Sequence, residues 1–129
     1  MSLEISDEEL AAVSRLATAE RYAYFIKRIC DFEEVWTLRD GDGFIVMGDS
    51  SGNQYIPVWP AARFAKEHGG VGEEATAIPL DAWLERWLPG LERDQTGIAV
   101  FPVDGDSGAV VDLDEHRDDI VAELETYES

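Results

Sequence analysis

The stretch from Thr76 to Pro102 (TAIPLDAWLERWLPGLERDQTGIAVFP) constrains the fold more than any other part of the chain. Its centre carries apolar residues at the spacing i, i+3, i+4, i+7, i+8 and i+11, which is typical of one helix face; these are Leu80, Trp83, Leu84, Trp87, Leu88 and Leu91. Pro89-Gly90 is expected to end the regular helix, and Ile98–Phe101 predicts a short buried strand. The stretch therefore predicts strand, helix and strand, with both tryptophans covering a sheet at ~150–250 Å² each.

The length and composition indicate one globular domain over residues 1–129, with residues 125–129 frayed. A hydrophobic content of 45% is enough for a packed core. The single cysteine, Cys30, cannot form an internal disulfide and fits a reducing compartment. No apolar run approaches the ~20 residues of a membrane span. Because the acidic N-terminus lacks the basic and apolar segments of a secretory signal, we expect a cytoplasmic protein.

The charge of the chain is strongly negative, with 28 acidic and 10 basic residues and a net charge of −18. Such a surface repels nucleic acid and anionic membranes, so neither is expected as a partner. Two interpretations stay open: an acidic surface that binds a basic protein, or an adaptation to a salty cell interior. The presence of only two lysines, Lys27 and Lys66, fits the second interpretation.

Two helices are predicted at the start of the chain. A capping-box pattern at Ser6-x-x-Glu9 marks the first, and Thr18 is expected to cap the second. The second helix has an apolar stripe and a basic outer side, formed respectively by Tyr22, Phe25, Ile26 and Ile29 and by Arg21, Lys27 and Arg28. Cys30 follows the stripe, and we interpret it as a small core residue rather than a nucleophile.

Three strands are predicted next, at Val35–Leu38, Phe44–Met47 and Gln54–Trp59. The turn sequences Asp40–Gly43 and Gly48–Asn53 separate them, which favours an antiparallel meander. Pro57 lacks a backbone donor, so we place it at an edge, a strand end or a bulge.

The second half predicts further helices and a hairpin. Pro60 is expected to open a short helix that ends at Gly69-Gly70, and Asp104–Gly108 is expected to join Ile98–Phe101 to a strand at Ala109–Val111. Asp114 is expected to cap a last helix that runs through Leu124. The predicted fold is α+β, a mainly antiparallel sheet of five or six short strands with helices packed chiefly on one face.

Two serine motifs resemble catalytic sequences. Gly48–Gly52 matches G-x-S-x-G, but a nucleophile elbow leads from a strand into a helix, and here a strand is expected to follow. Gly105–Gly108 matches the GDSG stretch of chymotrypsin-like proteases, and His68 and Asp81 precede it in the right order. Those enzymes are about twice this length, and both residues have structural explanations at helix ends. We therefore predict no catalytic residue.

Two aspartate pairs resemble the start of calcium loops, Asp40-x-Asp42 and Asp104-x-Asp106. Each lacks an oxygen ligand at the third position, where Phe44 and Gly108 stand, so hairpin turns explain them better. The chain has no cysteine and histidine spacing for a metal and no glycine-rich phosphate loop. We therefore predict no metal site and no cofactor.

Several short motifs occur together: RYxYF at 21–25, VWxL at 35–38, IPVWP at 56–60, IPL at 78–80, WLPGL at 87–91 and AVFP at 99–102. In combination they resemble the bacterial family known as domain of unknown function twenty-seven fifty, over about Thr18–Val111. The strand-proline-helix rhythm also resembles the SseB N-terminal domain. The family resemblance implies a single α+β domain and assigns neither an activity nor catalytic residues.

Two main hypotheses for function remain, beside a structural or assembly role. The favoured one is a non-enzymatic binding module, similar in size, charge and fold to the immunity proteins that neutralise a bacterial toxin by binding it. In this hypothesis acidic residues attract a basic protein partner; the candidates are Glu33, Glu34, Asp40, Asp42 and Asp49. The alternative is a small-molecule sensor or small enzyme with a cleft near the Gly69–Glu74 loop, lined by Trp36, Trp59, Trp83 and Trp87. The oligomeric state stays open.

Overall fold

The computed structural model describes residues 4–127 of the chain. In chain order its helical elements are α1 (Asp7–Ser14), α2 (Thr18–Phe32), α3 (Ala62–His68), α4 (Leu80–Ala82), the π-helical turn η1 (Trp83–Trp87), α5 (Leu88–Arg93) and α6 (Leu113–Glu125). Its strands are β1 (Glu34–Asp40), β2 (Gly43–Phe44), β3 (Met47–Gly48), β4 (Gln54–Val58), β5 (Glu73–Pro79), β6 (Gly97–Val100) and β7 (Ala109–Val111). Within these residues, no helix has the length and apolar character to cross a membrane.

The strands form two sheets, with the orders β2-β1-β5 and β3-β4-β6-β7. β1 and β5 are antiparallel along their whole length, β4 and β6 are parallel, and β6 and β7 are antiparallel. A backbone bridge joins the sheets, because Trp36 and Trp59 exchange two N–H to C=O hydrogen bonds of 2.9 and 2.8 Å. The predicted α+β class is confirmed, with seven short strands among the described residues.

The predicted three-stranded meander is wrong in its middle strand. Phe44–Met47 does not form one return strand: β2 pairs with β1, and β3 pairs with β4 in the other sheet. Between them the side chain of Ile45 packs against the core, and its N–H donates to Leu38 at 2.9 Å. The segment therefore crosses from one sheet to the other, which the local sequence pattern could not indicate.

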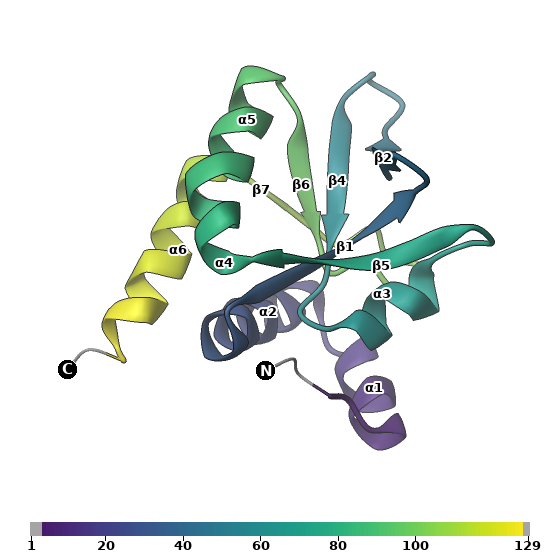
Figure 1. Ribbon diagram of the computed structural model, residues 1–129. Helices are drawn as coiled ribbons and strands as arrows, with labels where there is room; N and C mark the ends of the chain where they lie inside the picture. Colours follow the sequence, from purple (N-terminus) through teal and green to yellow (C-terminus); the bar gives the residue numbers. More distant parts are fainter. Residues whose placement is uncertain (1–3, 128–129) are drawn as a thin grey trace.

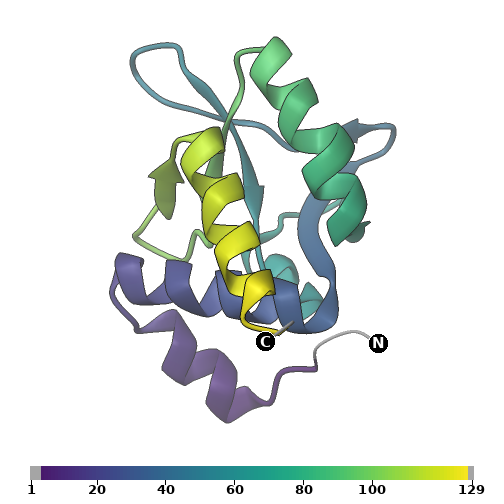
Figure 2. The same ribbon diagram turned by 90° about the vertical axis from the view of Figure 1, so that its left-hand side faces the viewer.

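The helices lie on several sides of the two sheets (Figure 1). In this view α4, α5 and α6 lie on the left, α3 on the right, and α2 below the strands, with α1 beneath it. The view from the left places α6 beside the continuous α4–η1–α5 helix, with α2 crossing below (Figure 2). One apolar core fills the space between these layers; its fully buried members include Phe25, Ile29, Val35, Val58, Trp59, Trp83, Leu88, Ile98 and Phe101.

The tryptophan-bearing helix forms as predicted but does not end at Pro89-Gly90. It continues to Arg93, because the turn before the proline widens to π geometry. The N–H of Leu88 bonds to the carbonyl of Trp83, five residues earlier. Pro89 then stands in the first turn of α5, where a missing N–H is tolerated.

The helix starts show which caps the sequence predicted correctly. Ser6 Oγ accepts the N–H of Glu9 at 3.1 Å, as the capping pattern predicts. Thr18 is not the cap of α2: Ala17 stands there, and its N–H donates to Glu20 Oε1 at 3.3 Å. The other two helix starts also differ from the prediction, because α3 begins at Ala62, after Pro60, and α6 is preceded by Asp112 rather than Asp114.

Pro57 lies where β4 has no partner strand on one side. The carbonyl of Val58 accepts the N–H of Phe101 on the β6 side, so Pro57, one residue earlier, faces the opposite side. There β3 has already ended, and Thr37 Oγ1 donates to the carbonyl of Pro57 at 2.7 Å. The missing N–H therefore costs no ladder hydrogen bond.

The predicted hairpin between β6 and β7 forms, and its turn depends on two glycines. Gly105 has φ +82° and Gly108 has φ +90°, conformations that side chains rarely adopt. A Cβ on Gly105 would meet no atom within 4 Å, whereas a Cβ on Gly108 would lie 2.5 Å from the carbonyl oxygen of Val100. Alanine at Gly105 therefore tests the free-energy cost of the positive φ alone, whereas alanine at Gly108 adds the cost of the steric overlap.

We predict that Gly108→Ala destabilises the protein by roughly 3 kcal/mol or more, because strain and steric overlap combine. Gly105→Ala, the matched control in the same turn, is expected to cost about 1–2 kcal/mol, for the dihedral alone. Urea unfolding of both variants measures the difference. Equal losses in the free energy of unfolding of the two variants would show that the turn relaxes around a side chain at position 108.

Candidate functional site

The five acidic residues proposed from the sequence lie in three separate places. Glu33 ends α2 in the left-handed conformation and Glu34 begins β1, whereas Asp40 and Asp42 lie at the far end of that strand. Seven extended residues span roughly 20 Å, so these two pairs cannot contact one partner group. Glu34 Oε2 accepts the indole N–H of Trp36 at 3.2 Å. The structure therefore brings these carboxylates together only in pairs.

Asp49, the fifth of these residues, organises the turn between β3 and β4. Its carboxylate accepts hydrogen bonds from the N–H groups of Ser51 and Asn53, from the Asn53 amide and from the Tyr55 hydroxyl, at 2.9–3.1 Å. The Asn53 bonds are the largest cause of a lowered Asp49 pKa. Since this turn leads into β4, the Gly48–Gly52 motif has no helix after it and forms no nucleophile elbow.

The four tryptophans divide into core and surface residues. Trp59 and Trp83 are fully buried, while Trp36 and Trp87 are half-buried. Trp87 stacks edge-on against the exposed Phe44 ring at 4.7 Å and borders a shallow, open hollow with Arg86 and Asp94. The two buried indoles are used in packing, so no cleft is lined by all four.

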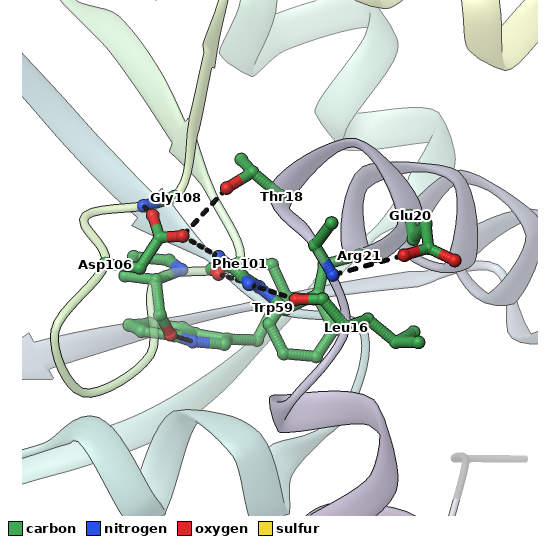
Figure 3. A network of polar contacts seen from close by, with 10 residues as sticks. Leu16, Thr18, Glu20, Arg21, Trp59, Phe101, Asp106 and Gly108 are labelled. Atoms are coloured by element: carbon green, nitrogen blue, oxygen red, sulfur yellow. Dashed lines mark hydrogen bonds and ion pairs between the residues drawn. The ribbon is translucent and has the colours of Figure 1, made fainter.

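A buried arginine holds the turn between β6 and β7 in place (Figure 3). Arg21 on α2 is only 3% exposed, so the prediction that it lies on the outer side of this helix is wrong. Its Nε donates to the carbonyl of Phe101 at 3.2 Å and its Nη1 to that of Leu16 at 2.7 Å. Its Nη2 lies 2.9 Å from Asp106 Oδ2, an ion pair without the alignment of a hydrogen bond.

Asp106 completes this network from the turn itself. In addition to its ion pair with Arg21, Asp106 accepts hydrogen bonds from Thr18 Oγ1 at 2.7 Å and from the N–H of Gly108 at 2.9 Å. The Arg21 contact, followed by these two bonds, lowers the pKa of Asp106 to about 2. Asp106 therefore stays ionised at neutral pH and ties the turn to the start of α2.

Phe101 is held in a strained conformation at the base of this turn. Its φ of +61° is unusual for a bulky residue and costs about 1–3 kcal/mol. Arg21 holds the carbonyl of Phe101, and Trp59 Nε1 donates to the carbonyl of Pro102 at 2.9 Å. The core thus fixes the backbone that forms one wall of a neighbouring cleft.

That cleft lies between α1, α3 and the β6–β7 turn and has a volume of about 260 Å³. Its deeply buried lining residues are apolar, and most of its polar lining residues are exposed and form the rim. The apolar residues are Leu10, Ala11, Phe64, Phe101, Pro102 and Val103, and the polar ones are Asp7, Ser14, Glu67, His68 and Asp104. It is the best-formed candidate binding site within residues 4–127, because apolar walls and convergent polar groups meet there.

The rim carboxylates differ in whether the protein neutralises them. Asp7 forms an ion pair with Arg63, whose guanidinium also donates to the carbonyl of Ile5 at 3.0 Å. Glu67 on α3 and Asp104 on the β6–β7 turn are exposed, and neither has a hydrogen bond or ion pair within the described residues. The two open carboxylates stand on different walls of the cleft.

Sequence reasoning did not identify this site. Asp104 was interpreted as a turn residue and His68 as a helix-end residue, and both interpretations describe their local structure correctly. His68 also lies against Trp59, with ring centroids 5.3 Å apart. The cleft joins segments from the start, middle and end of the chain, so no local pattern could have signalled it.

A comparison with protein-family models finds a match over residues 22–120, most of the chain, to the family described as protein of unknown function (DUF2750). The chain belongs to this family. The resemblance to this family stated from the sequence is thereby confirmed, and no curated protein matches the chain. The match includes α3 and the β6–β7 turn but not α1, so one wall of the cleft comes from outside the matched region.

The DUF2750 domain also contains a buried chain of polar contacts around His116 on α6. The indole Nε1–H of Trp83 donates to His116 Nε2 at 3.1 Å, and Tyr22 Oη lies 3.2 Å from His116 Nδ1. Tyr22 donates its own proton to Asp119 at 2.6 Å. Because an indole can only donate, Nε2 carries no proton, and Nδ1–H donates to Tyr22.

This arrangement keeps His116 neutral. A second proton on Nε2 would face the indole N–H of Trp83, and the aromatic ring of Phe25 also lies against the imidazole. Burial lowers the pKa of His116 to about 4, and nearby Asp119 opposes the shift only partly. The unfolded chain binds this proton near pH 6.5 and the folded chain near pH 4, so stability decreases as pH falls through that interval.

We predict that acidification from about pH 7 to about pH 5 removes about 2 kcal/mol of stability through His116. His116→Gln can keep an acceptor for Trp83 and a donor for Tyr22 but cannot titrate, so this part of the pH dependence should vanish. The control His68→Gln, which changes the exposed histidine, should retain this part of the pH dependence. Urea unfolding at both pH values measures the difference, and an unchanged dependence in His116→Gln would contradict the assignment.

The free cysteine of the DUF2750 domain is a core residue. Cys30 is buried, and its thiol lies 3.8 Å from the carbonyl of Ile120. Burial is the main cause that raises the pKa of the thiol to about 12, with Glu123 and Asp31 adding to the shift. Its thiolate is therefore scarce at neutral pH, in agreement with its interpretation as a packing residue. Across residues 4–127, no group of three or more metal-ligating side chains could hold a metal ion.

Proposed function

We propose that this DUF2750 domain is a non-enzymatic binding module that recognises a basic protein through the face around its α1–α3 cleft. The observation that carries the proposal is the combination of apolar walls with two unpaired carboxylates, Glu67 and Asp104, in one cleft. Apolar surface supplies binding energy on desolvation, and the carboxylates favour a positive partner. The net charge of −18 adds long-range attraction.

The proposed partner is a protein rather than a nucleic acid or a membrane, since both of these carry the same sign of charge as this chain. In its most specific form, the proposal is an immunity-like protein that neutralises a basic toxin by binding it. We place the protein in the bacterial cytoplasm, because its buried free cysteine suits a reducing compartment.

The acidic residues proposed from the sequence have a different role in this proposal. Electrostatic steering acts over the Debye length, about 8–10 Å at moderate salt, and needs no direct contact. Carboxylates outside the cleft therefore accelerate the encounter, while the cleft and its rim hold the bound partner; they are Glu33, Glu34, Asp40, Asp42 and Asp49.

The test uses three double variants that each remove two negative charges. Glu67→Gln with Asp104→Asn changes the rim, Asp40→Asn with Asp42→Asn changes the β1–β2 hairpin, and Asp118→Asn with Glu125→Gln changes the exposed side of α6. Tagged proteins are used to capture partners from a native lysate at low and high salt. The captured basic protein is then identified, purified and titrated against each variant.

We predict that the rim variant binds the purified partner at least about tenfold more weakly, mainly through faster dissociation. The hairpin variant should mainly slow association at low salt, and the α6 variant should resemble the wild type. Equal losses in all three variants would indicate attraction by net charge alone. That result, or the absence of any basic partner, contradicts the proposal.

A second candidate function is a small-molecule sensor, and the combination of apolar and polar residues that line the same cleft favours it. Its 260 Å³ is just below the ~300–1,000 Å³ of typical ligand sites. A thermal-shift screen of metabolites distinguishes this candidate, because a ligand at 100 times its Kd stabilises the folded state by about 2.7 kcal/mol. A neutral metabolite that stabilises the wild type but not a cleft variant would favour the sensor.

A further inference from the structure

The polar groups around the cleft share one chemical property, which is that they can all accept hydrogen bonds. Glu67 and Asp104 offer carboxylate oxygens, Ser14 a hydroxyl oxygen, and His68 a ring nitrogen when neutral. No arginine or lysine of the described residues lines the cleft, and Arg63, beside the lining residue Phe64, is paired with Asp7. Ser14 and His68 can also donate, but the two carboxylates only accept, so the site is suited to a group that donates several hydrogen bonds.

The volume and shape of the cleft limit the size of that group. At about 260 Å³ it is below the range for drug-sized ligands, so one side chain of a partner fits better than a larger molecule. Leu10, Ala11 and Val103 are at least partly exposed and can contact an aliphatic stem, above a base formed by the more deeply buried Phe64 and Phe101. A long side chain with an apolar stem and a charged head matches both regions.

Arginine fits these requirements better than lysine. Its planar guanidinium carries five N–H donors in a fixed arrangement, no acceptor, and a permanent positive charge. One guanidinium can therefore bond to carboxylates on two walls at once, whereas an ammonium acts as a compact, more strongly hydrated charge. The same chain already places Arg28 over Tyr24, at 5.2 Å, and Arg39 over Phe44, at 5.6 Å.

Contacts from the core hold two walls of the cleft in place. Arg21, Trp59 and Asp106 fix the backbone of the β6–β7 turn from inside the core, so Asp104 stands on a held segment. Glu67 stands on α3, whose Phe64 packs edge-on against Phe101 at 4.7 Å. Little conformational entropy is lost when an already ordered site binds its ligand.

We propose that the cleft between α1, α3 and the β6–β7 turn is an arginine pocket, which receives one arginine side chain of the basic partner. This inference rests on the proposed function and deepens it, because it assigns the residue type that anchors the partner. Glu67 and Asp104 clamp the guanidinium, and Leu10, Ala11 and Val103 contact its stem.

The test is an NMR titration of the ¹⁵N-labelled protein with Nα-acetyl-arginine-N-methylamide. The probe should shift the amide signals of α1, α3 and residues 101–104 and saturate in the millimolar range. The citrulline analogue has nearly the same shape without the charge and should cause no saturable shift. The lysine analogue should bind several-fold more weakly, and equal binding of lysine or citrulline would overturn the assignment to arginine.

Variants of the chain show where the arginine probe binds. Glu67→Gln with Asp104→Asn should reduce the affinity for the arginine probe at least about tenfold, whereas Asp118→Asn with Glu125→Gln should leave it unchanged. Leu10→Ala should weaken binding of the probe through its stem while both carboxylates remain. Shifts that map to α6 or to the β1–β2 hairpin, or an unaffected rim variant, would overturn the pocket.

Failure of the arginine pocket and failure of the proposed binding module give different results. If a purified basic partner binds in a rim-dependent manner but the arginine probe does not, the arginine pocket is wrong and the binding module stands. If the probe binds at the cleft but no basic protein is ever captured, the pocket stands and the proposed partner class is wrong.

Discussion

The buried guanidinium of Arg21 is the interaction on which the arrangement of this domain depends. An unpaired charge inside a protein is very costly, so the surrounding chain must supply acceptors for it. The carbonyls of Leu16 and Phe101 and the carboxylate of Asp106 do so. They come from the α1–α2 connection, close to Arg21 in sequence, and from the β6–β7 turn, and one side chain thereby joins two parts of the chain that are about 80 residues apart.

The sequence predicted the local elements better than their assembly. Helical periodicity located the tryptophan helix, and turn residues located the β6–β7 hairpin. Arg21 was placed on the outer side because a hydropathy pattern treats every arginine as a surface residue, and its partners lie up to 85 residues away. The pairing of β1 with β5 and the split between β2 and β3 likewise depend on contacts that no local pattern contains.

The candidate site was even harder to predict from local sequence patterns than the pairing of the strands. Its acidic character could be expected from composition, but the residues chosen from the sequence fall at three separate places, while Glu67 and Asp104 line one cleft only because of the tertiary structure. Phe101 carries no sequence signal of its strained backbone, because the contacts that hold it come from residues distant in sequence, namely Arg21, Val58 and Trp59. In this domain the folded core organises the surface that is available for recognition.

The π-helical turn at Trp83–Trp87 gives the long helix two faces that a regular α-helix could not present together. Each residue of an α-helix turns by about 100° around the helix axis. The one extra residue in this turn therefore changes the direction in which all later side chains of the helix point. At the first residue of the turn, the indole of Trp83 donates to His116, and after the turn Leu88 and Leu91 are buried in the core. Removal of one residue here would restore regular winding and rotate those leucines away from the sheet, so the segment tolerates substitution of its exposed side chains more readily than any change in its length.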